Sequence, residues 1–295
     1  MTLWKKYYLA KTIKDAVQVL AIAPDRSCLI AGGTDLLLDL QQGRHAPVDT
    51  LVDVTSIPEL TTLEIRQNEL FIGAAVPLNR VVASDLVQRH AQALKEAGAL
   101  IGGPQVRNTA TLGGNVGHAL PAADGTIALV ALGAEAQVAG PAGTRRVPLV
   151  DLFLGPGRST LSAGGELLVG FYIPLGSPDD CQASAFRRVM RPQGVAIAIL
   201  NTAIWLRRQA DQVADIRIAV GPSGPTPRRS HKTEAVLRGR RLNSLTEAWL
   251  DEALDAFLSE ASLRTSPHRA TQVYRQHLAR TLLEETLNAA WQRTF

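Results

Sequence analysis

Cysteine is almost absent from this sequence, and its scarcity excludes several kinds of site. Only Cys28 and Cys181 occur among 295 residues, and they lie far apart in the chain. A disulfide framework needs several paired cysteines, and iron–sulfur clusters or cysteine-bound zinc need groups of closely spaced ligands. We therefore exclude such metal centres within this chain. No apolar signal segment follows Met1, so we expect a cytoplasmic protein.

Long apolar runs and aromatic residues are scarce as well. No segment reaches the roughly 18 uninterrupted apolar residues of a membrane-spanning helix, so we expect no membrane span. Aromatic residues make up 5% of the chain, which leaves few side chains for stacking nucleobases. The net charge of +4 comes mostly from dispersed arginines. We expect these arginines to form a solvated surface or to face an acidic protein partner, and we expect no nucleic acid.

The signatures of common catalytic sites are missing too. The histidines show no H-E-x-x-H spacing, and the sequence has no G-x-S-x-G elbow, P-loop or G-x-G-x-x-G fingerprint. A self-contained hydrolase, a kinase and a NAD-type Rossmann domain are therefore disfavoured. We predict neither catalytic residues nor metal ligands in this chain.

Apolar residues are plentiful at 46%, and their spacing predicts the secondary structure. In the first half, helices alternate with strands, which is typical of an α/β domain. Helices are predicted at 12–23, 36–42, 85–100 and 124–132, and strands at 27–30, 51–54, 70–72 and 135–138. The polar, glycine-rich stretch 102–121 is predicted to be irregular and to bind a ligand, because such long loops are uncommon otherwise.

The pattern changes after residues 176–180, which we interpret as a linker. Successive strands without intervening helices predict an antiparallel meander, at 183–189, 196–206 and 213–220. Helices are predicted at 232–238, 245–259 and 267–291. The predicted fold class is therefore α+β, with an α/β domain at 1–176 and a C-terminal domain at 180–295 that combines a three-stranded antiparallel sheet with helices.

Two glycine-rich turns are the most informative features of the chain. The first is Ala31-Gly32-Gly33-Thr34-Asp35-Leu36, and the second is Thr111-Leu112-Gly113-Gly114-Asn115. Glycine lets the backbone turn sharply and lets another group approach closely. A diphosphate needs several convergent N–H donors on such a backbone. We interpret the turns as two halves of one clamp around a phosphate-bearing ligand.

The side chains beside the turns suit the same ligand. Thr34 adds a hydroxyl, and Asp35 is expected to cap the N–H groups of the helix that follows. Asn115 adds an amide that can donate and accept, and Asp124 could accept from a ribityl or ribose hydroxyl. One glycine pair before a helix is often only a connection, so the pair of turns is stronger evidence than either alone.

Both turns resemble the flavin-binding motifs of one enzyme family. This family comprises the FAD-binding, or medium, subunits of the molybdenum hydroxylases, of the xanthine dehydrogenase and carbon monoxide dehydrogenase type. The run Ile30 to Leu36 is similar to the first motif of the family. The second motif is the more specific, because about a dozen consecutive residues from Pro104 to Asn115 agree in type. The resemblance covers essentially the whole chain.

The resemblance implies a fold and a cofactor. The fold is a two-part FAD-binding domain of the vanillyl-alcohol-oxidase/PCMH type, with subdomains at about 1–58 and 59–176, followed by the C-terminal domain. The cofactor is FAD. The residues that the resemblance places around FAD are Ile30, Ala31, Gly32, Gly33, Thr34, Asp35, Leu36, Ile101, Thr111, Gly113, Gly114, Asn115, His118, Asp124, Leu168 and Arg187, with Arg188 as the alternative to Arg187.

The implied roles differ among these residues. The two turns surround the diphosphate, Asp124 lies on the ribityl or an adjacent polar part of FAD, and Ile101 lies near the flavin. Arg187 or Arg188 stands where the family usually has a lysine. His118 departs from the family pattern: it could face the flavin or the phosphates, or its imidazole could be satisfied by the backbone of its own loop.

The resemblance also implies partners. A large subunit would hold the molybdopterin cofactor, and a small subunit would hold [2Fe–2S] clusters, in a dimer of heterotrimers. This chain would pass electrons from the clusters through FAD to an external acceptor. Two alternatives stay open: a stand-alone flavin-dependent oxidase, and a non-enzymatic ligand-binding or assembly module.

Overall fold

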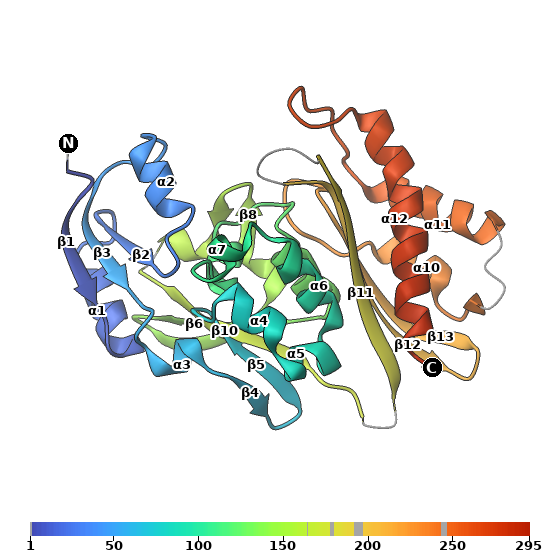
Figure 1. Cartoon of the computed structure of the whole chain (residues 1–295), viewed down its shortest axis with the longest axis horizontal. Helices are drawn as coiled ribbons and strands as arrows, with labels where there is room; N and C mark the ends of the chain where they lie inside the picture. Colours follow the sequence, from blue (N-terminus) through green and yellow to red (C-terminus); the bar gives the residue numbers. More distant parts are fainter. Residues whose placement is uncertain (1, 164, 178–179, 192–196, 243–246) are drawn as a thin grey trace.

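Three main sheets follow one another along the length of the molecule (Figure 1). The computed structural model describes residues 2–163, 165–177, 180–191, 197–242 and 247–295. A small parallel sheet lies at the N-terminal end, a five-stranded antiparallel sheet lies in the middle, and a three-stranded antiparallel sheet lies at the C-terminal end. The predicted α+β fold class is confirmed.

The N-terminal sheet has the strand order β1-β3-β2, and all its strands are parallel. Its elements are β1 (Trp4–Leu9), α1 (Ile13–Ile22), β2 (Ser27–Ile30), α2 (Leu36–Gln41) and β3 (Val48–Asp53). Helix α1 begins as predicted, because the Thr12 side chain accepts a hydrogen bond from the Asp15 N–H. The sequence pattern missed β1, an edge strand whose side chains are mostly exposed and therefore carry no apolar signal.

The central sheet has the strand order β4-β5-β10-β6-β7. Its strands are β4 (Leu63–Arg66), β5 (Glu69–Gly73), β6 (Glu135–Gly140), β7 (Gly143–Pro148) and β10 (Leu167–Pro174), and the small pair β8 (Phe153–Gly155) and β9 (Arg158–Ser159) lies beside it. The helices of this region are α3 (Pro58–Thr61), α4 (Leu78–Ala83), α5 (Asp85–His90), α6 (Gln92–Leu100), α7 (Pro104–Arg107), α8 (Leu112–Gly117) and α9 (Asp124–Ala131). The middle strand β10 was not predicted, because it is buried on both faces and shows no alternation.

Two predictions for this region were wrong. The helix expected at 85–100 is two helices, since Ala91 leaves the helical conformation at φ −144° and ψ 49° and is fully buried by its neighbours. The stretch 102–121 is not irregular throughout. Pro104 stands in the first turn of α7, where its missing N–H costs nothing, and the Thr111 side chain caps α8.

The C-terminal sheet is the predicted meander. Its strands are β11 (Cys181–Met190), β12 (Ala198–Gln209) and β13 (Gln212–Gly221), and its helices are α10 (His231–Leu237), α11 (Glu247–Glu260) and α12 (Gln272–Gln292). Helix α12 begins later than predicted because Thr271 caps it and the residues just before form a bridge between Ser266 and Ala270. Residues 178–179 of the expected linker, the first residue of the strand 196–206 and the first two of the helix 245–259 lie outside the described residues.

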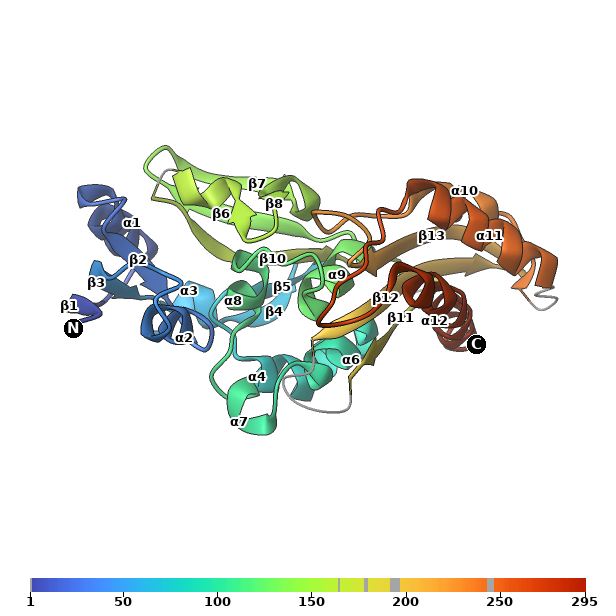
Figure 2. The same cartoon turned by 90° about the horizontal axis from the view of Figure 1, so that it is seen from above.

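The C-terminal sheet has one face in each of two cores. Its own helix α12 packs against β11 and β12, whereas α6 and α9 of the central region pack against β11, β12 and β13 (Figure 2). Because side chains alternate along a strand, Ala203 and Trp205 join the central core, and Ile204 and Leu206 join the C-terminal core. The two halves of the chain therefore share a buried interface.

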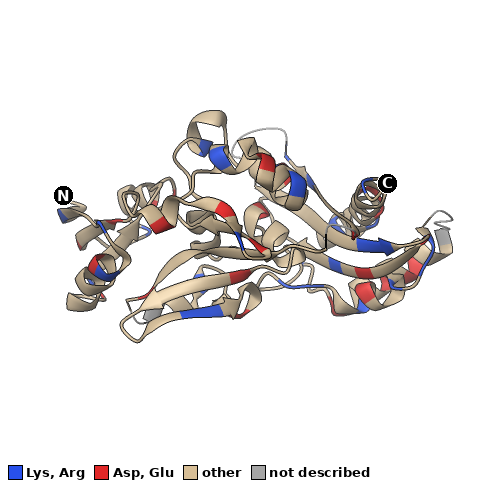
Figure 3. Ribbon diagram, turned by 90° about the horizontal axis from the view of Figure 1, so that it is seen from below, with Lys and Arg blue, Asp and Glu red and all other residues tan. Residues whose placement is uncertain are grey.

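Charges are spread along the chain. Lys and Arg are interspersed with Asp and Glu along the ribbon (Figure 3). Among the described residues, no helix is long and apolar enough to cross a membrane. The same residues contain no group of three or more His, Cys, Asp or Glu side chains that could hold a metal ion.

Candidate functional site

The first glycine turn leaves the carboxyl end of strand β2. In open parallel sheets, this edge is where ligands bind. Gly33 has φ +66°, a left-handed conformation that favours glycine. The N–H groups of Gly32, Gly33, Thr34 and Asp35 donate no hydrogen bond within the described part of the chain. The turn therefore presents consecutive open donors, the arrangement that binds anions.

Asp35 does not cap the helix that follows, so this prediction was wrong. Its backbone is already helical, at φ −96° and ψ −47°, and its side chain makes no capping hydrogen bond. A capping side chain reaches back to the helix only from an extended backbone. Thr111, at φ −110° and ψ 158°, has that conformation and does cap α8. The N–H of Leu37 donates to Gly33 O at 3.0 Å, whereas the N–H groups of Thr34 and Asp35 before α2 are left open.

The two turns lie against each other, although they are far apart in the sequence. A Cβ atom on Gly32 would lie 2.2 Å from the carbonyl oxygen of Thr109 and 2.8 Å from Cα of Ala110. Only glycine allows this approach of two backbones. The first turn is thus seated on the residues that lead directly into the second.

The second turn differs from the first, because its N–H groups are already used. The N–H of Gly113 donates to Ala74 O at 2.8 Å, that of Gly114 to Oγ1 of Thr111 at 3.0 Å, and that of Asn115 to Thr111 O at 3.0 Å. A Cβ on Gly113 would lie 2.5 Å from Ala74 O. The second turn is a tightly packed wall rather than an open cluster of donors.

Asn115 and Asp124 are also engaged within the protein. Oδ1 of Asn115 accepts from the N–H of Thr126 at 3.3 Å, which leaves its NH2 group as the available part. Asp124 is 5% exposed, and its carboxylate forms an ion pair with Arg188 and accepts from Asn201 Nδ2 at 2.6 Å. Burial raises the pKa of Asp124, and the charge of Arg188 offsets part of that rise.

The two neighbouring arginines point to different partners. Arg187, the predicted site residue, pairs with Glu96 on α6 at 3.3 Å, and 38% of its side chain is exposed. Arg188 is the buried one, and it contacts Asp124 and the carbonyl oxygen of Leu100. The structure therefore brings Arg188, and not Arg187, to the predicted residue Asp124.

The remaining predicted residues belong to the central region of the chain. Cδ1 of Leu168 lies 3.9 Å from the Cβ position of Gly117 at the end of α8. Ile101 packs against the central core, and its carbonyl oxygen accepts a hydrogen bond from Nη1 of Arg107 at 3.1 Å. His118 is half-buried after α8, and its imidazole makes no hydrogen bond to any described residue. The expectation that its own loop would satisfy this imidazole is not met.

Sequence reasoning missed two contributors to this region. Thr109 lies within the second motif, and its carbonyl oxygen is the surface on which Gly32 packs. Asn201 lies within an apolar strand, where a lone buried amide is a usable signal because buried polar groups need partners.

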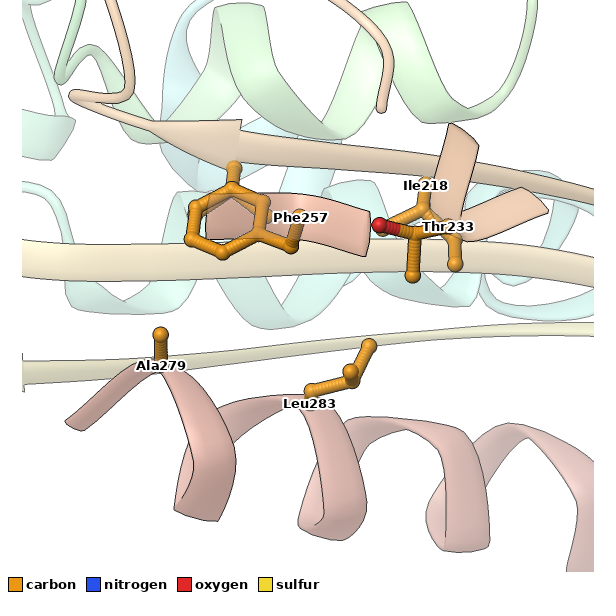
Figure 4. Close-up of a pocket in the computed structure, with 6 residues that line it drawn as sticks. Ile218, Thr233, Phe257, Ala279 and Leu283 are labelled. Carbon is orange, nitrogen blue, oxygen red and sulfur yellow. The ribbon is translucent and has the colours of Figure 1, made fainter. Parts of the chain in front are cut away.

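A small apolar cavity elsewhere in the chain is unrelated to the turns (Figure 4). Its lining side chains come from β13 and the C-terminal helices, and they include Ile218, Phe257 and Leu283. None of the predicted cofactor residues lines it. It is a packing gap inside the C-terminal core.

Comparison with known protein families assigns both halves of the chain. Residues 3–176 match the family of the FAD binding domain in molybdopterin dehydrogenase, and residues 184–290 match the CO dehydrogenase flavoprotein C-terminal domain. The chain belongs to the family of FAD-binding medium subunits of molybdenum hydroxylases. It is an oxidoreductase subunit, and its cofactor is FAD.

Individual relatives of this medium subunit match over almost their whole length. The carbon monoxide dehydrogenase medium chain of Hydrogenophaga pseudoflava is 31% identical over 291 residues, covering 98% of this chain and 97% of the relative. The xanthine dehydrogenase FAD-binding subunit of Escherichia coli O157:H7 is 30% identical over 289 residues, covering 96% of this chain and 95% of the relative.

Solved structures of the family share the fold. Carbon monoxide dehydrogenase from Hydrogenophaga pseudoflava superposes with a TM-score of 0.91 at 29% identity, over 99% of both chains. Quinoline 2-oxidoreductase from Pseudomonas putida 86 gives a TM-score of 0.88 at 26% identity, over 99% of this chain and 98% of that one. The resemblance predicted from the two motifs is confirmed.

Proposed function

We propose that this medium subunit carries FAD between its two glycine turns and relays electrons from partner subunits to an external acceptor. The observation that carries the proposal is the open set of N–H groups from Gly32 to Asp35, seated on the second motif. These groups suit a diphosphate, which needs several convergent donors and a close backbone. The residues present therefore fit the cofactor.

We assign distinct roles to the two turns. The first turn, Ile30 to Leu36, would bind the diphosphate through its backbone, with the Thr34 hydroxyl as a further donor. The second turn, with Thr111, Gly113, Gly114 and Asn115, would shape the wall beside the cofactor. Ile101 and Leu168 would exclude water from the flavin. His118 has an imidazole that makes no bond to any described residue, which leaves it able to contact the cofactor.

The division of the chain follows the same proposal. We propose an FAD-binding domain at 1–176, with subdomains at about 1–58 and 59–176, and a C-terminal domain at 180–295. The ranges 3–176 and 184–290 that match two family models support this division. Both cysteines are free thiols, which supports a cytoplasmic location.

The electron-relay role explains what the chain lacks. Bound flavin accepts electrons one at a time and passes them on in pairs, so the protein has only to bind, orient and shield it. We propose a large molybdopterin-binding subunit and a small [2Fe–2S] subunit as partners, in a dimer of heterotrimers. Relatives named as medium chains of carbon monoxide dehydrogenase and of nicotine 6-hydroxylase support such an assembly.

Purification of the chain with and without its partners tests this function. We expect the isolated chain to bind FAD at a ratio near one to one, and to show no flavin reduction by substrate unless the partners are present. A chain that stays colourless after incubation with FAD would refute FAD binding. Substrate-dependent reduction by the isolated chain would instead favour a stand-alone oxidase, and pterin binding without redox activity would favour an assembly module.

A further inference from the structure

Three buried polar side chains meet where the two halves of the molecule join. Arg188 on β11 and Asn201 on β12 are directly opposite each other in the antiparallel pair. Asp124 is the first residue of α9, which packs against β12 and β13. Only 3% of the Arg188 side chain and 6% of the Asp124 side chain are exposed.

The contacts of Arg188 and Asn201 tie three segments together. Nη1 of Arg188 donates to Oδ2 of Asp124, and its Nη2 donates to Leu100 O at 2.5 Å. Nδ2 of Asn201 donates to Oδ1 of Asp124 at 2.6 Å and to Ala122 O at 3.2 Å. The C-terminal sheet thereby holds both the end of α6 and the start of α9.

Stability alone does not account for this cluster. The desolvation penalty of a buried ion pair can exceed its Coulombic attraction, so an apolar pair is often at least as stable. Nε of Arg188 and Oδ1 of Asn201 are buried without a hydrogen-bond partner among the described residues. A planar, forked guanidinium does fix the positions of the groups it contacts.

The start of α9 is joined in turn to the second glycine turn. The N–H of Thr126 donates to Oδ1 of Asn115, and the Cβ position of Gly125 lies 2.7 Å from the same oxygen. The N–H of Asn115 donates to Thr111 O, at the residue that caps α8. Arg188 is therefore linked to the second turn by two contacts, one to Asp124 and one from Thr126 to Asn115, with the first turn of α9 between them.

We propose that Arg188 is a positioning residue, which holds the second glycine turn in place for FAD from the C-terminal sheet through Asp124, Thr126 and Asn115. The proposal rests on the proposed function, because it assumes that this turn forms a wall of the FAD site. In this proposal Asp124 supports the second turn, whereas the sequence predicted that it would contact a ribityl hydroxyl. The Asp124 carboxylate is buried and both of its oxygens are occupied.

Substitution of Arg188 by methionine tests the proposal, with Arg238→Met as the matched control. Arg238 is in an exposed ion pair with Asp215 at 3.1 Å, with 47% of its side chain accessible. Amide hydrogen exchange would be measured by mass spectrometry over residues 111–126, with α1 as an internal reference. FAD affinity would be measured by quenching of flavin fluorescence.

We expect Arg188→Met to speed exchange in residues 111–126 about tenfold or more while α1 exchanges as in the wild type. We expect the dissociation constant for FAD to rise roughly 5–150-fold, the usual range of coupling between sites. Arg238→Met should change neither. Equal acceleration in α1, unchanged exchange in 111–126, or unchanged FAD affinity would each overturn the proposal.

A second variant and the exchange measurement keep the test decisive if Arg188→Met does not fold or if FAD does not bind. If Arg188→Met does not fold, Arg188→Lys replaces it, because lysine keeps the charge beside Asp124 but lacks the fork that also reaches Leu100. Local acceleration in 111–126 with this variant supports the proposal, and wild-type exchange refutes it. If the wild-type chain binds no FAD, the proposed function fails, but the exchange measurement still decides whether Arg188 positions the turn.

Discussion

The two glycine turns look alike in sequence but differ in what their backbones do. The N–H groups of Gly32 to Asp35 donate to no described residue, whereas those of Gly113 to Asn115 are all bonded within the chain. The glycines also stand differently relative to the capping residue of the helix. Thr111 is extended and caps its helix, while Asp35 is helical and does not. Gly113 and Gly114 follow the cap and lie inside α8, where Ala74 O and Thr111 Oγ1 accept from their N–H groups, whereas Gly32 and Gly33 precede the cap of α2 and stay open.

Among substitutions within the two turns, Gly32→Ala should produce the largest effect, because it separates the turns. The added Cβ would lie 2.2 Å from Thr109 O, which is backbone and cannot move aside as a side chain would. Overpacking costs about 1–3 kcal/mol, and about 1.4 kcal/mol corresponds to a tenfold change in affinity. We expect FAD to bind up to about 100-fold more weakly, as measured by fluorescence quenching.

The control for this substitution is Gly155→Ala, since nothing lies within 4 Å of the Cβ position of Gly155. It should leave FAD affinity unchanged. Wild-type affinity in Gly32→Ala would show that the seating of the first turn on Thr109 is irrelevant to the cofactor.

Thr111→Val should have the next largest effect, because it frees the N–H of Gly114. Loss of a threonine cap costs about 1 kcal/mol. We expect the free energy of unfolding to fall by about that amount and FAD affinity to fall severalfold, measured by denaturation with urea and by fluorescence.

Thr271→Val is the matched control, because Thr271 caps α12 in the same manner, by accepting from the N–H of Tyr274 at 3.2 Å. This substitution should lower the free energy of unfolding by a similar amount without weakening the binding of FAD. Equal loss of FAD affinity in both variants would mean that the second turn has no specific part in the site.

High pH should weaken the sheet edge that supports the first turn. The Tyr7 hydroxyl donates to Asp53 Oδ2 at 2.5 Å, at the sheet edge from which the first turn leaves. Burial, followed by the hydrogen bond to Asp53, raises the pKa of Tyr7 from 10.0 to about 12. Because the pKa is raised in the folded state, this contribution to stability is complete below pH 10 and is lost as the pH rises toward 12.

Urea denaturation between pH 9 and pH 12 measures this effect in the wild type and in Tyr7→Phe. We expect the wild type to be the more stable at pH 9, and the difference to shrink as the tyrosine ionises. A difference that stays constant over this range would contradict the role of the hydrogen bond.

Asp35→Asn should have the smallest effect. Because the Asp35 side chain makes no capping hydrogen bond, we expect the free energy of unfolding to change by no more than about 0.5 kcal/mol. A loss of about 1 kcal/mol in thermal or urea unfolding would show that the carboxylate does cap α2.

The sequence predicted the parts of the fold that have a strong local signal. Alternating apolar residues identified the C-terminal meander, and Thr12 identified the start of α1. It did not predict β10, whose two buried faces erase the alternation, or the break at Ala91, which tertiary packing imposes. The two motifs themselves predicted the family.

The candidate site was predictable in composition but not in contacts. The glycines indicated close approach, and the structure shows it between Gly32 and Thr109. The choice between Arg187 and Arg188 could not be made from sequence. Adjacent residues of a strand point to opposite faces, and only the fold decides which face meets Asp124.

Hydrogen exchange at the two turns, with and without FAD, tests the central claim most directly. The claim is that the open N–H groups of the first turn bind the cofactor while the second turn is already satisfied. It predicts that FAD slows exchange at residues 32–35 strongly, and that exchange at residues 113–115 is slow before FAD is added and changes little. Rapid exchange at 32–35 in the FAD complex, with new protection confined to 113–115, would contradict it.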